Sequence, residues 1–337
     1  MIAMVRVYVV TYRRPLLLER ALRSLLAQSC TAWVAEVLND DPADARVAEL
    51  IARLGDPRIQ LSQPSQHRGG TGNFNYAFRA VAEPFASILE DDNWWEPFFL
   101  ATMLAALERQ PEIALACGNE RIWREQPDGS WENTGVTIWP SATTPTLFPW
   151  RAMDKCGGAK LCNSALLFRT ADAPRWRTPD DIPIDVTEHF RERVVPHPFL
   201  LVPLPLVNYA ETLTTHRTSQ AGIWGGYQLL LIGSVFVLEK PARRPALAEA
   251  LWHWVRHEAP PTIATLIITG LVVAEARDLW AQASLREKLR HLAGALRHPL
   301  TTSRVATART RHPAAWAFLL QGPFADFMAN HRPHADP

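Results

Sequence analysis

Acidic side chains form two clusters in the first hundred residues, each directly after a short apolar run. Asn39-Asp40-Asp41 follows Val34–Leu38, and Glu90-Asp91-Asp92-Asn93 follows Phe85–Leu89. Carboxylates that converge repel one another and favour a cation or a ligand rich in hydrogen-bond donors. A divalent cation that joins a carboxylate to diphosphate oxygens meets this requirement. The clusters therefore indicate a metal-assisted site for a phosphorylated ligand.

Two further segments carry side chains suited to such a ligand. Thr11-Tyr12-Arg13-Arg14 follows the apolar run Val5–Val10, and a tyrosine just past a strand suits stacking on a base. The segment His67–Gly72 opens a predicted helix, whose N–H groups could hold phosphate. It has neither the Walker nor the G-x-G-x-x-G spacing. Structural alternatives stay open, because the aspartates before Pro42 could also start a turn or cap a helix.

The elements that would position these clusters alternate between strands and helices, as in a mostly parallel α/β sheet. Predicted strands cover Val5–Val10, Val34–Leu38, Arg58–Leu61 and Phe85–Leu89. Predicted helices cover Arg14–Gln28, Arg46–Leu54, Gly72–Val81 and Glu96–Gln110. Ligands of open α/β sheets bind outside the carboxyl ends of the strands. The polar clusters are therefore expected to line one crevice.

The pattern changes further along the chain. Apolar runs on either side of Gln126–Ser130 predict a hairpin between Ile113 and Ile138. Strands are expected at Ser164–Phe168 and Phe199–Val202, with a helix over Val186–Val194. From about residue 222 helical patterns replace the strands. We expect an α/β domain over residues 1–220 and a helical region over 221–337.

Composition narrows the class of protein. The 337 residues include 35 Lys and Arg against 34 acidic residues, which gives no support for a nucleic-acid binder. The four cysteines are scattered, as for ordinary reduced thiols. The apolar runs Tyr227–Leu238 and Thr262–Ala274 are shorter than the roughly 20 residues of a membrane-spanning helix. The first ten residues are typical of a strand rather than a signal peptide, so we expect a cytoplasmic location.

Taken together, these motifs resemble glycosyltransferase family 2, whose fold is GT-A, a Rossmann-like mixed sheet flanked by helices. The resemblance covers about the first 220 residues. It rests on four segments in the family's order, with weaker matches at Cys162–Thr170, Ile184–Val194 and Pro205–Ser219. The four segments are Val7–Gln28 (VYVVTYRRPLLLERALRSLLAQ), Glu36–Asp44 (EVLNDDPAD), Asp56–Val81 (DPRIQLSQPSQHRGGTGNFNYAFRAV) and Ser87–Leu100 (SILEDDNWWEPFFL).

The resemblance assigns nucleotide-sugar-binding roles to seven residues and a metal ligand to an eighth. Thr11 and Tyr12 would line the base pocket, and Asp41 and Asp40 would hydrogen-bond the base. Arg68 would face the phosphates. Glu90-Asp91-Asp92 stands where the family has its DxD motif, with Glu in place of the first Asp. Asp91 would approach the ribose, and Asp92 would hold Mn²⁺ or Mg²⁺ on the diphosphate.

The catalytic base falls in a less complete part of the resemblance. The family's segment usually reads Glu-Asp, whereas this chain has Ile184-Asp185. Asp185 is the expected base, and Glu188 is the competing candidate. In the structural alternative both residues only begin a helix and complement its dipole. His216 stands where some members place a histidine near the metal or diphosphate, and a surface histidine is the alternative.

The implied reaction is transfer of a sugar from a nucleotide-diphospho-sugar, first of all a UDP-sugar, to an acceptor hydroxyl with inversion. Two other readings stay open: a nucleotidyltransferase, and a sugar-nucleotide-binding protein that has lost activity. The sequence does not identify the acceptor. For the helical region we expect a role in the acceptor site, in a homodimer interface or in contact with a membrane surface.

Overall fold

The computed structural model describes residues 4–330 except 157–158, 197, 215–220 and 258–262. Two compact units are present, and the chain passes between them several times. The first unit contains Met1–Pro149, Lys160–Asp180 and Val195–Thr215. The second contains Trp150–Ala159, Asp181–Val194 and His216–Pro337. The division is therefore interleaved, whereas the sequence led us to expect one boundary near residue 220.

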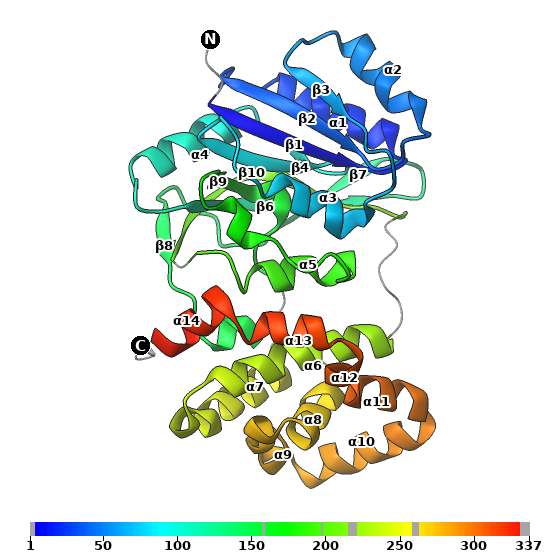
Figure 1. Cartoon of the computed structure of the whole chain (residues 1–337), viewed down its shortest axis with the longest axis vertical. Helices are drawn as coiled ribbons and strands as arrows, with labels where there is room; N and C mark the ends of the chain where they lie inside the picture. Colours follow the sequence, from blue (N-terminus) through cyan, green and yellow to red (C-terminus); the bar gives the residue numbers. More distant parts are fainter. Residues whose placement is uncertain (1–3, 157–158, 197, 215–220, 258–262, 331–337) are drawn as a thin grey trace. The chain divides into compact units, whose positions relative to one another are not determined.

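The first unit is built on a mixed sheet whose described strands run in the order β3-β2-β1-β4-β9-β6-β10-β5. One half is parallel and comes from the first 90 residues: β1 (Val5–Thr11), β2 (Trp33–Asn39), β3 (Ile59–Ser62) and β4 (Phe85–Glu90). All four were expected at these places. The helices between them are α1 (Pro15–Leu26), α2 (Ala45–Leu54) and α3 (Gly69–Ala77). Figure 1 shows this half in colours from blue to cyan.

The other half of the sheet is mixed. Strand β9 (Leu166–Arg169) pairs antiparallel with both β4 and β6 (Leu115–Glu125), and β10 (Phe199–Glu211) runs parallel to β6. The expected hairpin is confirmed, because β7 (Trp131–Thr137) pairs antiparallel with β6. Two short strands, β5 (Trp94–Trp95) and β8 (Thr146–Phe148), pair with β10. Helix α4 (Phe99–Glu108) follows β5.

Strand β10 is longer than the predicted strand Phe199–Val202. Its register with β6 shifts between Val202 and Pro205 and again between Pro205 and Val207. Proline cannot donate to a ladder, so prolines within a strand accompany bulges. The chain tolerates Pro203 and Pro205 in this way and continues pairing to Glu211.

The second unit is helical. It contains α5 (Ile184–Arg191), which begins two residues earlier and ends three residues earlier than expected. The other helices are α6 (Ala221–Leu238), α7 (Arg244–His257), α8 (Ile263–Val272), α9 (Arg277–Gln282), α10 (Leu285–Arg297), α11 (Pro299–Ala306), α12 (Ala308–Arg311), α13 (Pro313–Leu319) and α14 (Gly322–Asn330). Its core includes Val186 and Phe190 of α5, packed in one cluster with the apolar residues of α6 and α8.

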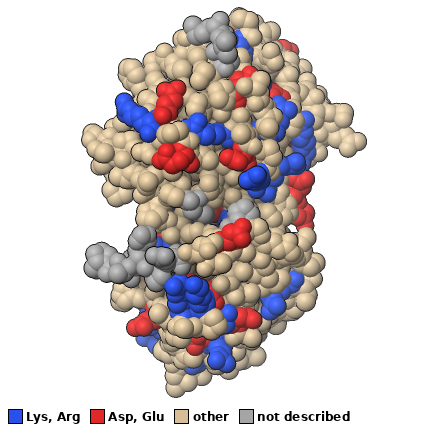
Figure 2. All heavy atoms as spheres, turned by 60° about the vertical axis from the view of Figure 1, so that its left-hand side comes forward, with Lys and Arg blue, Asp and Glu red and all other residues tan. Residues whose placement is uncertain are grey.

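Helix α6 supplies much of this core, and Leu229, Leu230, Val235 and Phe236 have no exposed surface. Among the described residues, no single helix is long and apolar enough to cross a bilayer. One bent pair, Gly222–Leu238 with Pro241–His257, passes that test by length and composition only. On the face drawn in Figure 2, basic and acidic side chains are interspersed, as the near-zero net charge suggests.

Candidate functional site

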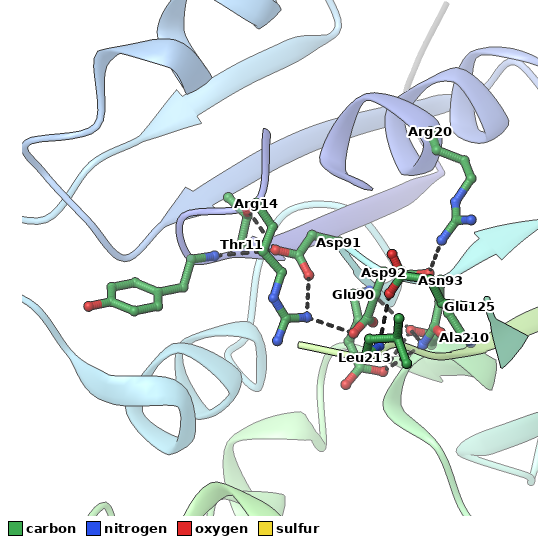
Figure 3. A network of polar contacts seen from close by, with 12 residues as sticks. Thr11, Arg14, Arg20, Glu90, Asp91, Asp92, Asn93, Glu125, Ala210 and Leu213 are labelled. Carbon is green, nitrogen blue, oxygen red and sulfur yellow. Dashed lines mark hydrogen bonds and ion pairs between the residues drawn. The ribbon is translucent and has the colours of Figure 1, made fainter. Parts of the chain in front are cut away.

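The candidate site lies where the strand order of the sheet reverses. Strand β1 has β2 on one side and β4 on the other, and the chain adds β3 beyond β2. In open α/β sheets the crevice at such a point is the usual ligand site. Thr11 is the last residue of β1, and Asp91 directly follows β4. Figure 3 shows both side chains at this end of the sheet.

Asp91 is held by the loop that follows β1. Its Oδ2 accepts hydrogen bonds from Thr11 Oγ1 at 2.8 Å and from the Tyr12 backbone N–H at 3.3 Å. The Asp91 residue is 6% exposed, so these bonds lie in a largely dry environment. A carboxylate held in this way has a fixed direction. The structure thus brings together three residues that the sequence predicted for the nucleotide site.

Asp92 is paired with a cation from the chain itself. Arg14 Nη1 lies 2.7 Å from Asp92 Oδ2 and 3.4 Å from Asp91 Oδ1, so one guanidinium serves both carboxylates (Figure 3). Arg20 Nη2 donates to the Asp92 backbone carbonyl at 2.6 Å. The Arg20 guanidinium is itself stacked between Trp94 and Trp131, 3.9 and 4.1 Å from their ring centroids.

The electrostatics of the acidic pair follow from its burial. Burial, and then the neighbouring charge of Asp92, raise the pKa of Asp91 to about 7. Burial also raises the pKa of Asp92, and the Arg14 cation opposes that shift. Removal from water disfavours a charged carboxylate, whereas an adjacent positive charge favours it. A cation placed beside the two aspartates therefore stabilises their charged form.

Asp40 organises the loop before α3. It is 2% exposed, and its Oδ1 accepts the Arg68 backbone N–H at 2.7 Å. Its Oδ2 lies 2.9 Å from His67 Nδ1. The His67 ring in turn lies 5.1 Å from the Tyr12 ring, centroid to centroid. Because Asp40 already positions two neighbours, it acts in this structure as a support for the loop beside Tyr12.

Asp41 pairs with the loop after β1. Arg13 Nε donates to Asp41 Oδ2 at 2.5 Å, and this bond lowers the pKa of Asp41 below its usual range. Arg13 has a φ of 59°, the only non-glycine residue described with a positive φ in this structure. Such a backbone costs an L-residue roughly 1–2 kcal/mol. Its guanidinium also lies over the Tyr12 ring at 4.9 Å.

Arg68 and Glu90 each contact residues other than the acidic pair. The Arg68 guanidinium stacks over Tyr76 at 4.2 Å and donates to Asn73 Oδ1 at 3.4 Å. Glu90 Oε2 accepts from Ser164 Oγ at 2.8 Å and from Asn93 Nδ2 at 3.1 Å. Glu90 thus bonds Ser164, in the segment just before β9, whereas Asp91 and Asp92 pair with Arg14.

The predicted base candidates belong to the second unit. Asp185 lies in the first turn of α5, and Glu188 follows it by three residues. Both are partly exposed. The charge of Glu188 favours the protonated form of Arg191, although burial lowers the pKa of Arg191 to about 9. His216, the second predicted metal ligand, lies outside the described residues.

The contacts of three side chains at the candidate site were not predicted from the sequence. Arg14 contacts both aspartates of the acidic pair. Arg20 contacts the backbone carbonyl of Asp92 and the rings of Trp94 and Trp131, and His67 joins Asp40 to Tyr12. Two arginines directly after a strand, before the helix-starting Pro15, were the available signal for Arg14. The sequence contains no comparable signal for Arg20, because an arginine within a helix is normally exposed to solvent.

Comparison with known proteins finds one family by sequence. The sequence model described as glycosyl transferase family 2 matches residues 6–167. A curated relative, the putative colanic acid biosynthesis glycosyl transferase WcaA of Escherichia coli (strain K12), is 23% identical over 120 residues. That match spans 35% of this chain and 43% of the relative.

Solved structures share the fold over nearly the whole chain. TarS residues 1–349 of S. aureus, in complex with UDP-GlcNAc, superposes with a TM-score of 0.58 at 14% identity. The UDP complex of the same protein superposes with a TM-score of 0.57 at 14% identity. Each match covers 92% of this chain and 91% of the TarS chain. Residues 6–167 thus match the model of glycosyl transferase family 2, and the mixed sheet with its flanking helices has the GT-A fold.

Proposed function

We propose that this chain transfers a sugar from a nucleotide-diphospho-sugar, most simply a UDP-sugar, to an acceptor hydroxyl. The observation that carries the proposal is the contact of Thr11 and Tyr12 with Asp91 at the point where the strand order reverses. The family of residues 6–167 supports the reaction class. The UDP and UDP-GlcNAc complexes of TarS, a protein of the same fold, support the choice of UDP.

The donor pocket is assigned to the loops that end β1, β2 and β4. The Tyr12 ring is 42% exposed and is available for stacking on a base. We assign Asp91, fixed by Thr11, to the ribose hydroxyls. Asp41 is the carboxylate we assign to the base edge: its partner Arg13 is an exposed side chain, whereas Asp40 is buried and bonded to Arg68 and His67.

The acidic pair fits a divalent cation by its chemistry. Hard cations such as Mg²⁺ and Mn²⁺ take carboxylate oxygens, and Asp92 Oδ2 already attracts a positive group, Arg14. We assign Asp92 as the residue that would hold Mn²⁺ or Mg²⁺. The ion would supply positive charge to the diphosphate leaving group. Arg14, displaced from Asp92, would keep its charge close to that same group.

The acceptor hydroxyl must lose its proton as it attacks the anomeric carbon. A carboxylate is the general base that this step requires. Asp185 and Glu188 are the two candidates that the sequence offers, and attack opposite the leaving group inverts the anomeric configuration. Asp185 is the assigned base, with Glu188 as its competitor.

The donor assignment has a direct test with the purified full-length chain. UDP with Mn²⁺ is expected to raise the melting temperature more than UDP alone, because a ligand that binds only the folded state stabilises it. UDP is also expected to raise the melting temperature more than ADP, because a pocket that hydrogen-bonds one base leaves polar groups unpaired when another base binds. Equal or absent shifts with all nucleotides, measured by differential scanning fluorimetry, would contradict the donor assignment.

A second prediction concerns Arg14. Arg14→Gln is expected to tighten Mn²⁺ binding to the nucleotide-free protein by about tenfold, because a charge-assisted bond to Asp92 no longer has to be broken. Electron paramagnetic resonance of free Mn²⁺ measures this binding without any turnover. Arg13→Gln is the matched control, since the guanidinium of Arg13 bonds Asp41 rather than Asp91 or Asp92. Unchanged Mn²⁺ affinity in Arg14→Gln would show that Arg14 does not compete with the ion.

A further inference from the structure

The helical unit exposes a concentrated apolar stripe on α10. Five leucines between residues 285 and 300 have side chains that are 56–77% exposed: Leu285 (72%), Leu289 (57%), Leu292 (56%), Leu296 (76%) and Leu300 (77%). The first four lie on α10, which has no buried residue, and Leu300 follows at the start of α11. Soluble proteins rarely leave so many large apolar side chains exposed next to each other.

The stripe has helical order. At about 100° per residue, the four leucines of α10 project within roughly 60° of one another. The arginines Arg286, Arg290 and Arg297 project within about 40° of one another, on the flank of the leucines. All three arginines are exposed. The surface of α10 therefore consists of one apolar band beside one basic band.

The rest of α10 holds the helix to its unit. Glu287 forms an ion pair with Arg256 of α7 at 2.8 Å and completes a capping box with Ser284. Lys288 lies over the Trp280 ring of α9 at 4.9 Å. Glu287 is the only acidic residue of α10, and its pairing leaves the exposed arginines without an acidic neighbour on their own helix. The α10 helix, labelled in Figure 1, also packs on α8 and α11.

We propose that the exposed face of α10 binds an anionic lipid surface. Helices that lie in a membrane interface combine an apolar face with basic residues, bury the apolar side chains among the acyl chains and pair the basic groups with anionic headgroups. Arginine can bury its stem while its guanidinium stays at headgroup level. Antiparallel pairing of two α10 helices through the leucines is disfavoured, because the two arginine bands would then meet.

The proposal does not depend on the proposed transferase activity. It concerns a face built from α10 and the first residues of α11, with none of the residues assigned to the donor site. Contact with a bilayer through this face would place the chain on a membrane surface without any spanning helix. The partner is thus a lipid surface of negative charge.

Vesicle flotation of the full-length chain tests the proposal. The wild type is expected to float with vesicles of phosphatidylcholine and phosphatidylglycerol, and not with phosphatidylcholine alone. Added salt should weaken this binding, because it screens the arginines. Leu289→Asp combined with Leu292→Asp is expected to lose at least about tenfold in vesicle affinity, since each leucine contributes by leaving water.

Matched variants test whether vesicle binding depends on the leucines and arginines of this face. Leu271→Asp changes a leucine of α8 that is 54% exposed and lies outside the stripe, and vesicle binding should stay unchanged. Replacing Arg286, Arg290 and Arg297 together with Gln should remove the preference for anionic vesicles. Circular dichroism confirms that each variant is folded, and donor binding should stay at the wild-type value in all of them.

Three outcomes would overturn the proposal. The first is a folded wild type that floats with neither kind of vesicle. The second is a double leucine variant that binds as well as the wild type. The third is a wild type that is a dimer by light scattering, with leucine variants that are monomers, when neither protein binds vesicles. The stripe would then join two copies of the chain.

Discussion

Asp92→Asn is expected to remove the metal-dependent part of nucleotide binding and to lower sugar transfer at least about a hundredfold. The amide is nearly isosteric with the carboxylate but carries no negative charge for a divalent cation. The fold should persist, because Asp92 contacts Arg14 at the edge of the site and contributes no apolar surface to the core. Nucleotide titrations with and without Mn²⁺, and transfer assays with the same protein, measure the two effects.

Glu90→Gln is the matched control for this prediction. Glu90 is the neighbouring acid of the same motif, but its Oε2 is bonded to Ser164 and Asn93. Its replacement should therefore leave Mn²⁺-dependent binding close to the wild-type value. If Glu90→Gln lost that binding while Asp92→Asn kept it, the metal ligand would be Glu90.

The second large effect is expected at the general base. Asp185→Asn should lower transfer by about 10²–10⁴-fold, because an amide cannot accept the proton of the acceptor hydroxyl. Donor affinity should stay unchanged, since Asp185 belongs to α5 and to none of the loops assigned to the nucleotide. Initial rates at saturating donor, together with a donor dissociation constant, separate the two quantities.

The alternative role of Asp185 predicts a different loss. An acidic side chain in the first turn of a helix stabilises it by about 0.3–1 kcal/mol through the helix dipole. If this were its whole contribution, Asp185→Asn would lower the melting temperature slightly and leave transfer intact. Glu188→Gln is the companion variant, because Glu188 lies beyond that first turn. A transfer defect confined to Glu188→Gln would assign the base to Glu188, and activity in both variants would place the base elsewhere.

The parallel half of the sheet was predictable because its signals are local. Runs such as Val5–Val10 and Phe85–Leu89 are mostly apolar on both faces, which is typical of strands covered by helices on each side. Each run also ends at the polar residues that mark the crevice. The positions of Thr11, Asp91 and Asp92 at strand ends therefore followed from the sequence, whereas the partners of these side chains did not.

The remaining features depend on contacts between distant residues. The sequence predicted a strand only over Phe199–Val202, yet pairing with β6 carries β10 past Pro203 and Pro205 to Glu211. Apolar periodicity predicted α5 but not its neighbours, because Val186 and Phe190 join a core made by helices that begin at residue 221. Arg14 was missed for the same reason, since its partners are 77 and 78 residues away in sequence.

The order of the strands has a consequence for synthesis of the chain on the ribosome. Strands β1 to β4 pair with neighbours made within the first 90 residues, but the second edge of β4 waits for β9, which ends at Arg169. An unpaired edge of an apolar strand is a template for pairing with other chains. The nascent α/β half must therefore carry an open edge while α4 and the β6–β7 hairpin are translated. A chaperone that binds during that interval would cover the open edge of β4, the strand that Asp91 and Asp92 directly follow.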